Sequence, residues 1–241
     1  SSVFVNAEST LPISNMIPSI ATRLGGFEKI TVATTIQHVH ALPRVVKALR
    51  KRGFKVQVAS GRKRQLLEGQ IIGCDYRPLK ESTDADAFLI IGSVFHGLGA
   101  SLSVNRPVIL SNPYSFEVTS METLRKRKLM QRYAEITHAA ECREFGVIVC
   151  SKPGQCNLEL AFRMRDLLRR KDKATSLIVA NEIGPEIPPN FATIDAFVNT
   201  GCPRLSIDDP ERFDRPMLLP QEALVALGET RWEKLVREGL L

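Results

Sequence analysis

The sequence predicts an α/β protein built from two similar units, each a small parallel sheet flanked by helices. Apolar runs of strand length, such as 29–35 and 87–92, alternate with helix patterns, which is the order typical of strand-helix-strand units. This alternation restarts after a long charged helix expected over 120–142. The segments 86–93 and 195–202 share Asp, Ala, Phe and Gly in register, so we interpret the second unit as a repeat of the first.

The elements of the first unit follow from apolar periodicity and from the positions of glycine and proline. A helix is expected over 11–24, and another over 43–52, where Pro43 suits the first helical turn. The segment 37–40 is expected to be a polar loop. Strands are predicted over 29–35, 54–60, 87–92 and 106–111.

The second unit is expected to begin with the charged helix, so the two α/β domains are predicted to cover 11–118 and 119–241. Its first strand, 145–150, leads through a loop into a helix over 156–170. Strands are also expected over 176–180 and 196–198, and two short helices around Gly228 should end the chain.

Composition narrows the class of protein. The chain has 241 residues and is 44% hydrophobic, which is enough to bury a core. Its apolar runs are far shorter than a membrane span, and we expect a cytoplasmic protein without a membrane partner. An odd number of cysteines argues against a disulfide framework and for free, metal-bound or redox thiols. The five cysteines are Cys74, Cys142, Cys150, Cys156 and Cys202.

The net charge of +7 leaves two interpretations of the basic segments. They could bind nucleic acid or an acidic protein, or they could be solvated helix faces. Only 6% of the residues are aromatic, which leaves few platforms for stacking bases, and the sequence contains no recognised nucleic-acid module. We therefore favour solvated faces and do not expect nucleic-acid binding.

The stretch 200–209 is the strongest candidate for chemistry. A strand that ends in Gly-Cys-Pro brings the thiol of Cys202 to the rim of a sheet, because proline stops the strand. Arg204 and Asp208 add a cation and a carboxylate to the same segment, so we expect a redox-active or metal-bound cysteine. Cys74 also follows a glycine, and the repeat suggests it as the counterpart of Cys202. The alternative is that each thiol is a small buried apolar residue.

Other candidates are weaker. His96 lies in a glycine-flanked loop expected to open a helix, which suits an anionic or nucleoside ligand, and Gln155 lies in a comparable loop of the second unit. Glu182 ends a strand without a basic neighbour in sequence, and it could bind a ligand amino or hydroxyl group or simply cap the backbone. His38 and His40 suit a structural or ligand-contact role in their loop.

Together these motifs resemble a known family, the radical enzymes that make the first intermediate of diphthamide, 2-(3-amino-3-carboxypropyl)histidine synthases. The string from Cys202 to Asp208 is the most specific of them. In chain order the matching motifs are Thr34-Thr35-Ile36-Gln37, Gly73-Cys74-Asp75, Phe95-His96, Asn112-Pro113-Tyr114, Lys152-Pro153-Gly154-Gln155, Asn181-Glu182-Ile183 and Cys202-Pro203-Arg204-Leu205-Ser206-Ile207-Asp208.

The resemblance implies three similar α/β domains, each giving one cysteine to a single [4Fe-4S] cluster. Residues 1–10 would then be the remnant of a missing first domain, and Cys74 and Cys202 would be two of three cluster ligands. Three thiolates leave one iron free to engage S-adenosylmethionine, and the reduced cluster supplies the electron that breaks a carbon-sulfur bond. The implied transferase moves the 3-amino-3-carboxypropyl group to a histidine of translation elongation factor 2.

The same resemblance assigns the remaining residues and partners. It implies a homodimer and an electron donor, and this chain alone would have little activity and no stable cluster. A non-catalytic scaffold subunit that pairs with a catalytic homologue is the alternative. The residues expected to line the S-adenosylmethionine pocket are Gln37, His96, Gln155 and Glu182, while Arg204 and Asp208 would shape the cluster loop.

Overall fold

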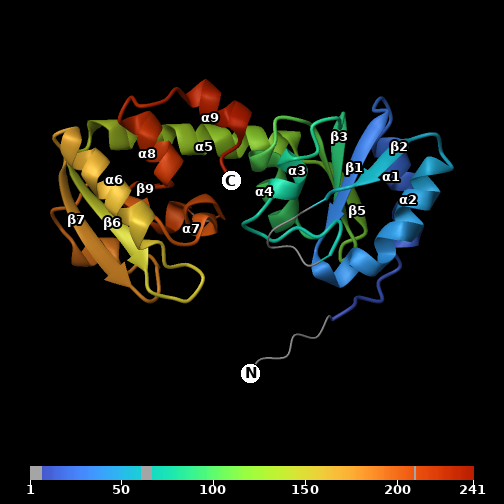
Figure 1. Cartoon of the computed structure of the whole chain (residues 1–241), viewed down its shortest axis with the longest axis horizontal. Coiled ribbons are helices and arrows are strands. Elements are labelled where there is room, and N and C mark those ends of the chain that lie inside the picture. Colours follow the sequence, from blue (N-terminus) through green and yellow to red (C-terminus); the bar gives the residue numbers. More distant parts are fainter. Residues whose placement is uncertain (1–6, 61–66, 209) are drawn as a thin grey trace. The chain divides into compact units, whose positions relative to one another are not determined.

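The computed structural model describes residues 7–60, 67–208 and 210–241 (Figure 1). The chain folds as two compact units, residues 1–126 with Leu241 and residues 127–240. The sequence also predicts a strand over 3–6 and a basic loop at 62–64, and these residues and Asp209 lie outside the described residues. Among the helices that the structure describes, none combines the length and the apolar character that a membrane span needs.

The first unit contains a five-stranded sheet in the order β2-β1-β3-β4-β5. The first four strands are parallel, as predicted, whereas β5 runs antiparallel to β4. The sequence did not predict β5, because its four residues are polar or only partly buried. The strands are β1 (Lys29–Thr34), β2 (Lys55–Val58), β3 (Ala87–Ile91), β4 (Val108–Asn112) and β5 (Glu117–Ser120).

Helices cover both faces of this sheet. Alternate residues of β3 point into two different cores, so the whole strand is apolar and buried. One core packs α1 and α2 against the sheet, and the other packs α3 and α4. The segment predicted as a polar loop at 37–40 is instead helical, within η2. The elements are η1 (Ile13–Met16), α1 (Ile17–Arg23), η2 (Ile36–Ala41), α2 (Leu42–Arg50), α3 (Arg77–Lys80) and α4 (Val94–Ser103).

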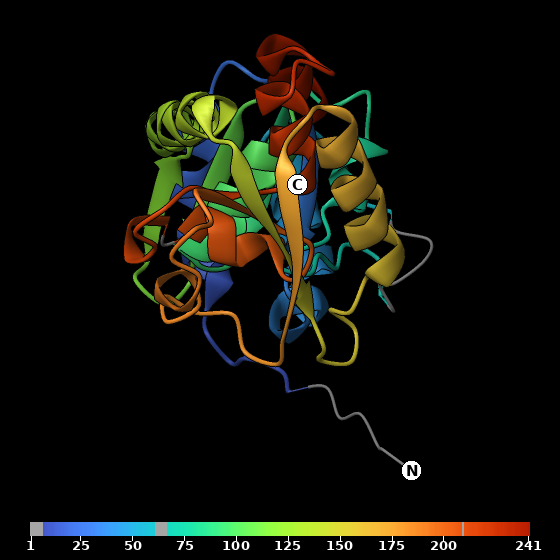
Figure 2. The same ribbon diagram turned by 90° about the vertical axis from the view of Figure 1, so that its left-hand side faces the viewer.

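The second unit contains a fully parallel sheet in the order β7-β6-β8-β9. Figure 2 shows β6 and β7 side by side, with α6 alongside them. The predicted charged helix is confirmed as α5 (Glu122–Glu141), and the two short terminal helices are confirmed as α8 and α9. The remaining elements are β6 (Glu144–Cys150), α6 (Leu158–Arg170), β7 (Ala174–Ala180), η3 (Pro188–Asn190), β8 (Ala196–Asn199), α7 (Pro203–Asp208), η4 (Pro210–Arg212), β9 (Met217–Leu218), α8 (Pro220–Ala226) and α9 (Trp232–Glu238).

Two expectations for this unit were wrong. The segment after Cys202 is not a loop, because Pro203 begins α7 immediately. Cys156 does not open α6 either, because the Oδ1 of Asn157 accepts the backbone N–H of Leu160 and caps the helix after the cysteine. Cys156 therefore lies in the exposed loop before the helix.

The aspartate shared by the two repeated segments has the same structural role in each unit. The Oδ2 of Asp86 accepts the N–H groups of Glu28 and Lys29 at 3.1 and 2.8 Å, where β1 begins. The Oδ2 of Asp195 accepts two N–H groups at the start of β6, both at 3.0 Å. These backbone bonds lower the pKa of both carboxyl groups. Each aspartate precedes one strand and bonds to the start of the neighbouring strand. By this alignment β1 corresponds to β6, and β3 corresponds to β8.

A buried ion pair organises the second unit. Arg132 of α5 and Glu222 of α8 are both fully buried and meet through two bonds of 2.8 and 2.6 Å. The remaining donors of Arg132 reach the carbonyl oxygens of Ser206 in α7 and Met217 in β9, at 2.8 and 2.9 Å. Glu222 also accepts the N–H of Leu219. One guanidinium group therefore joins four elements.

Candidate functional site at the carboxyl edges of the sheets

The predicted residues of the first unit follow the carboxyl ends of its parallel strands. Gln37 lies in η2, directly after β1, and His96 lies in α4, directly after β3. The chain before Cys74 is joined to the end of β1, since the N–H of Ile71 donates to the carbonyl of Thr34 at 2.8 Å. Parallel strands present their carboxyl ends at one edge, which is where open α/β sheets bind ligands.

Cys74 is exposed at the tip of a tight turn. Ile72 and Asp75 exchange backbone hydrogen bonds across Gly73 and Cys74, with N···O distances of 3.4 and 2.9 Å. A side chain at position 73 would overlap the ring of Phe95, so glycine lets the turn approach the start of α4. The buried carboxylate of Asp75 forms an ion pair with Arg77 and anchors the other side of the turn.

The sequence suggested that His96 lies in a loop before the helix. In the structure it is half-buried in the first turn of α4. Its Nδ1 lies 2.9 Å from the Oγ of Ser93, and its ring packs edge-on against Phe95. Phe95 thus contacts both the Cys74 turn and His96, which brings these two predicted residues to one place within the unit. Gln37 is exposed, and its carbonyl accepts the N–H of Ser9 at 2.9 Å.

In the second unit, Cys202 follows the carboxyl end of β8 and is partly exposed. Arg204 and Asp208 are one helical turn apart on α7 and form a two-point ion pair, with N···O distances of 2.9 and 2.6 Å. These two residues were expected in a loop around the thiol, and the structure instead uses them to brace the short helix behind it. The side chains of Arg204 and Asp208 are 6% and 27% exposed, so the cation is largely removed from solvent and the carboxylate less so.

Gln155 and Glu182 follow the adjacent strands β6 and β7. The expectation that Glu182 lacks a basic neighbour holds only in sequence, because its Oε1 lies 2.5 Å from the Nζ of Lys152. The Oε1 of Gln155 lies 3.5 Å from the Sγ of Cys150, which also contacts the carbonyl of Asn181. The carboxyl edge of this sheet therefore carries an amide, a carboxylate and an ammonium group.

The repeat does not make Cys74 and Cys202 counterparts, contrary to the sequence interpretation. Aligning Asp86 with Asp195 pairs Cys202 with Ser93, whereas Cys74 lies between β2 and β3, a connection whose counterpart contains Glu182. Cys74 and Cys202 thus follow the carboxyl edges of their units in connections that do not correspond, and the second unit also exposes Cys156 in the loop after β6.

The other cysteines differ from these two in exposure or position. Cys142 and Cys150 are buried, and burial raises the pKa of the Cys142 thiol. Within the part of the chain that the structure describes, no group of three or more His, Cys, Asp or Glu side chains is arranged to hold a metal ion. Cys74, Cys156 and Cys202 are accessible, and of these three the quoted family motifs contain Cys74 and Cys202.

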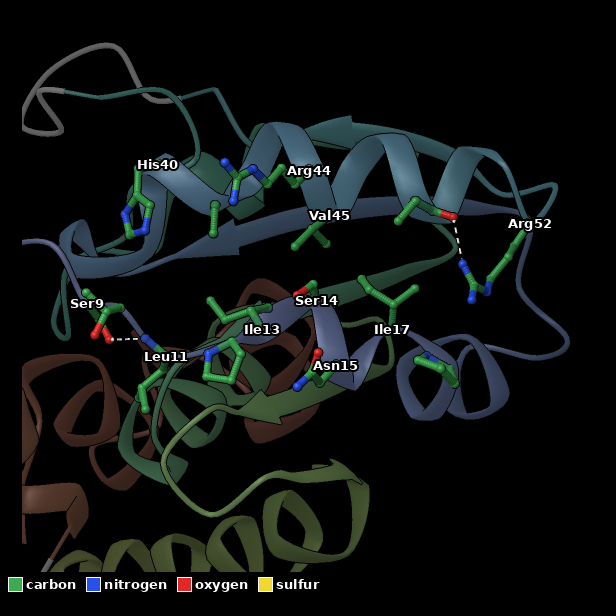
Figure 3. Close-up of a pocket in the computed structure, with 15 residues that line it drawn as sticks. Ser9, Leu11, Ile13, Ser14, Asn15, Ile17, His40, Arg44, Val45 and Arg52 are labelled. Atoms are coloured by element: carbon green, nitrogen blue, oxygen red, sulfur yellow. Dashed lines mark hydrogen bonds between the residues drawn. The ribbon is translucent and has the colours of Figure 1, made fainter.

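A cavity of about 560 Å³ in the first unit is lined by His40 but by none of the residues expected to bind the cluster or S-adenosylmethionine (Figure 3). It lies between the segment 9–18 and helix α2, with Ile13, Ile17 and Val45 in its walls and Arg44 and Arg52 beside it. Its lining does not include the Cys74 turn or His96.

Sequence reasoning missed two residues of the second edge. Lys152 was seen only as part of a motif, because its partner is thirty positions away. Asn199 lies just after the strand predicted over 196–198 and was not singled out, yet its side chain is 1% exposed and hydrogen-bonds to both Gly201 and Cys202. The signal in the sequence is an asparagine that directly follows an apolar strand and precedes Thr-Gly-Cys.

Fold and site together define a duplicated α/β protein whose polar and thiol side chains follow the carboxyl ends of the parallel strands in its two sheets. The family model for putative diphthamide synthesis proteins matches residues 1–236, and the chain belongs to this family.

Two relatives and one solved structure place the chain within the family. It is 34% identical over 201 residues to 2-(3-amino-3-carboxypropyl)histidine synthase of Pyrococcus horikoshii, covering 83% of this chain and 57% of the relative. It is 26% identical over 241 residues to subunit 1 of that synthase from Schizosaccharomyces pombe, covering 97% and 55%. The crystal structure of Dph2 from Pyrococcus horikoshii with a 4Fe-4S cluster matches with a TM-score of 0.81 at 31% identity, covering 95% and 64%.

The chain thus spans a little more than half the length of the curated relatives that it matches.

Proposed function

We propose that this chain forms two α/β domains, 11–118 and 119–241, of an enzyme for the first step of diphthamide biosynthesis. The enzyme transfers the 3-amino-3-carboxypropyl group of S-adenosylmethionine to a histidine of translation elongation factor 2. The observation that carries this proposal is that the family motifs in both units meet the carboxyl ends of parallel strands, where this class of sheet binds its ligands. The names of the relatives, which are synthases of this modified histidine, support it.

Cys74 and Cys202 are the proposed ligands of a [4Fe-4S] cluster. The accessible position of both thiols supports this role, as does the cluster in the Dph2 structure. When bound, the cluster supplies the electron that cleaves the carbon-sulfur bond of S-adenosylmethionine. The proposed third ligand belongs to a part of the family architecture that these 241 residues do not span.

Gln37, His96, Gln155 and Glu182 are proposed to bind S-adenosylmethionine. The Lys152–Glu182 pair supports this role for the second unit, because its two charges complement the carboxylate and the ammonium group of the methionine moiety. The side chains of Lys152 and Glu182 are 36% and 72% exposed, so the pair can exchange partners with a ligand at little cost in free energy. Arg204 and Asp208 support the cluster segment by bracing α7.

The proposed setting is a homodimer in the cytoplasm that receives electrons from a separate donor. A second candidate is a non-catalytic scaffold subunit that presents the translation factor to a catalytic homologue. The similarity to relatives named subunit 1 supports an assembly of more than one kind of chain.

The test is an anaerobic transfer assay with the protein from the complete gene, a chemical reductant, elongation factor 2 and S-adenosylmethionine labelled in its carboxypropyl group. We expect label on the protein substrate, and we expect Cys74→Ser and Cys202→Ser each to abolish it. Cys142→Ser is the matched control, because that thiol is buried in the core of the second unit, and it should retain transfer. Full transfer by both Cys74→Ser and Cys202→Ser would favour the scaffold.

The 241-residue chain alone provides a further check on the proposed domain organisation. We expect it to bind no stable cluster and to give no turnover after anaerobic reconstitution, because it contains only two of the three proposed cluster ligands. A full iron and sulfide content together with turnover would contradict this expectation.

A further inference from the structure

The side chain of Asn199 is bonded around the peptide that leads to Cys202. Its Oδ1 accepts the N–H of Gly201 at 2.9 Å, and its Nδ2 donates to the carbonyl of Cys202 at 2.8 Å and to the Oγ of Ser206 at 3.2 Å. An asparagine amide has two N–H donors, and here both are used. The orientation of the amide is fixed, since only its oxygen can accept from Gly201 and only its nitrogen can donate to Cys202.

The repeat shows that the sheet itself does not need a polar side chain at this position. Aligning Asp86 with Asp195 places Ile90 opposite Asn199, and Ile90 is fully buried in the core of the first unit. A buried amide is costly unless every group is bonded, whereas a buried isoleucine contributes to the core. The polar residue therefore occupies this position in β8, which leads to Cys202. The apolar residue occupies it in β3, which leads to Ser93.

The neighbouring contacts fix the rest of this segment. A side chain at Gly201 would lie 2.9 Å from the Cβ of Cys150, so the backbone runs against the end of β6. The hydroxyl of Thr200 donates to the carbonyl of Ile148 at 2.8 Å, which ties the end of β8 to β6 without bonding to residues 201–206. On the far side, Arg132 donates to the carbonyl of Ser206 at 2.8 Å. The backbone on both sides of Cys202 is thus held, while the residue itself stays partly exposed.

We propose that Asn199 is a positioning residue that fixes the backbone of Cys202 so that its thiol is presented in one orientation for iron ligation. The role in ligation rests on the proposed function of Cys202, whereas the restraint on the backbone does not. The residue acts through the peptide, because its amide bonds to the Gly201 N–H and the Cys202 carbonyl rather than to the thiol.

The test begins with the cluster-free protein from the complete gene. In Asn199→Leu, amide hydrogen exchange in the segment 201–206 should be faster by about tenfold, the factor expected from the loss of about 1.4 kcal/mol of hydrogen bonding. The rate at which iodoacetamide alkylates Cys202, followed by peptide mass spectrometry, should change as well. The rate at Cys74 should not change, which makes that cysteine an internal control.

Thr200→Val is the matched variant, because it removes a buried hydrogen bond at the same edge without touching the Cys202 carbonyl. It should lower overall stability without selectively changing exchange at 201–206. Asn199→Ala removes the same hydrogen bonds with a smaller side chain, so it should give the same change and serves if Asn199→Leu does not fold. Unchanged exchange and alkylation in the Asn199 variants would overturn the proposal.

After anaerobic reconstitution, Asn199→Leu should give a cluster with lower iron content or an altered electron paramagnetic resonance spectrum, while Thr200→Val should match the parent protein. If Cys202→Ser retains a normal cluster, the proposed function fails whatever Asn199 does. If Cys202→Ser loses the cluster and Asn199→Leu keeps both a normal spectrum and a normal iron content, the positioning role alone fails.

Discussion

The two units share a sheet but place their thiols differently. Strand orders β2-β1-β3-β4 and β7-β6-β8-β9 correspond, and Asp86 and Asp195 hold the same strand start in each. Yet Cys74 lies on a turn after residues that pair with the end of β1, whereas Cys202 lies between β8 and a short helix. Repetition of the fold therefore provides an equivalent edge in each unit, and the ligand-bearing loops on that edge differ in position and in construction.

The largest predicted difference between the units is their dependence on a buried charge. Arg132→Met should destabilise the second unit by about 3–5 kcal/mol, because it leaves Glu222 buried without its partner. Urea unfolding gives the size of the loss, and hydrogen exchange should locate it in β6 and β8 rather than in β1 and β3. The first unit should be unaffected, since neither residue of the pair belongs to it.

A double variant sharpens this prediction. Arg132→Met combined with Glu222→Leu should recover a large part of the loss, because it removes both charges instead of one. If the single variant costs less than about 1 kcal/mol, which is the range of exposed ion pairs, then the pair is not the anchor of this unit.

Removing the shared aspartate should have a smaller effect, and an equal one in the two units. Asp86→Ala and Asp195→Ala each leave two N–H groups at a strand start without their acceptor. Hydrogen exchange should show weakening at the start of β1 in one variant and of β6 in the other. An effect in only one unit would break the proposed correspondence.

The same carboxyl groups predict acid sensitivity. Their pKa values are lowered in the folded state, chiefly by backbone hydrogen bonds, so the unfolded chain binds protons first as the pH falls. Their contribution is present above the pKa of the unfolded chain, near 4, and is lost as the pH falls through the lower folded value. Stability of each alanine variant measured from pH 6 to pH 2 should fall less steeply than that of the parent.

The smallest predicted effect concerns His38, which is fully buried in η2 and packs edge-on against Tyr114. Burial lowers the pKa of His38, and the nearby His40 lowers it further. The unfolded chain therefore takes up a proton near pH 6.5 that the folded chain resists, so stability should fall as the pH drops below that value. His38→Phe should flatten this part of the stability profile, and an unchanged slope would contradict the assignment.

Sequence reasoning was sound where burial on both faces leaves a continuous apolar run, as in β3 and β6. It was wrong about α7, since Gly-Cys-Pro resembles a loop and the helix has only six residues. It also missed contacts between residues far apart in the chain. Lys152 meets Glu182 because β6 and β7 are neighbours, and Arg132 differs from the other basic residues of α5 only in what surrounds it.

The central claim is that one exposed or partly exposed thiol from each unit binds the same iron-sulfur cluster. Iron and sulfide content after anaerobic reconstitution of the protein from the complete gene tests it most directly, in the parent, Cys74→Ser, Cys202→Ser and the buried control Cys142→Ser. We predict a full [4Fe-4S] complement in the parent and the control, and loss of it in both other variants. A full complement with an unchanged spectrum in either Cys74→Ser or Cys202→Ser would contradict the claim.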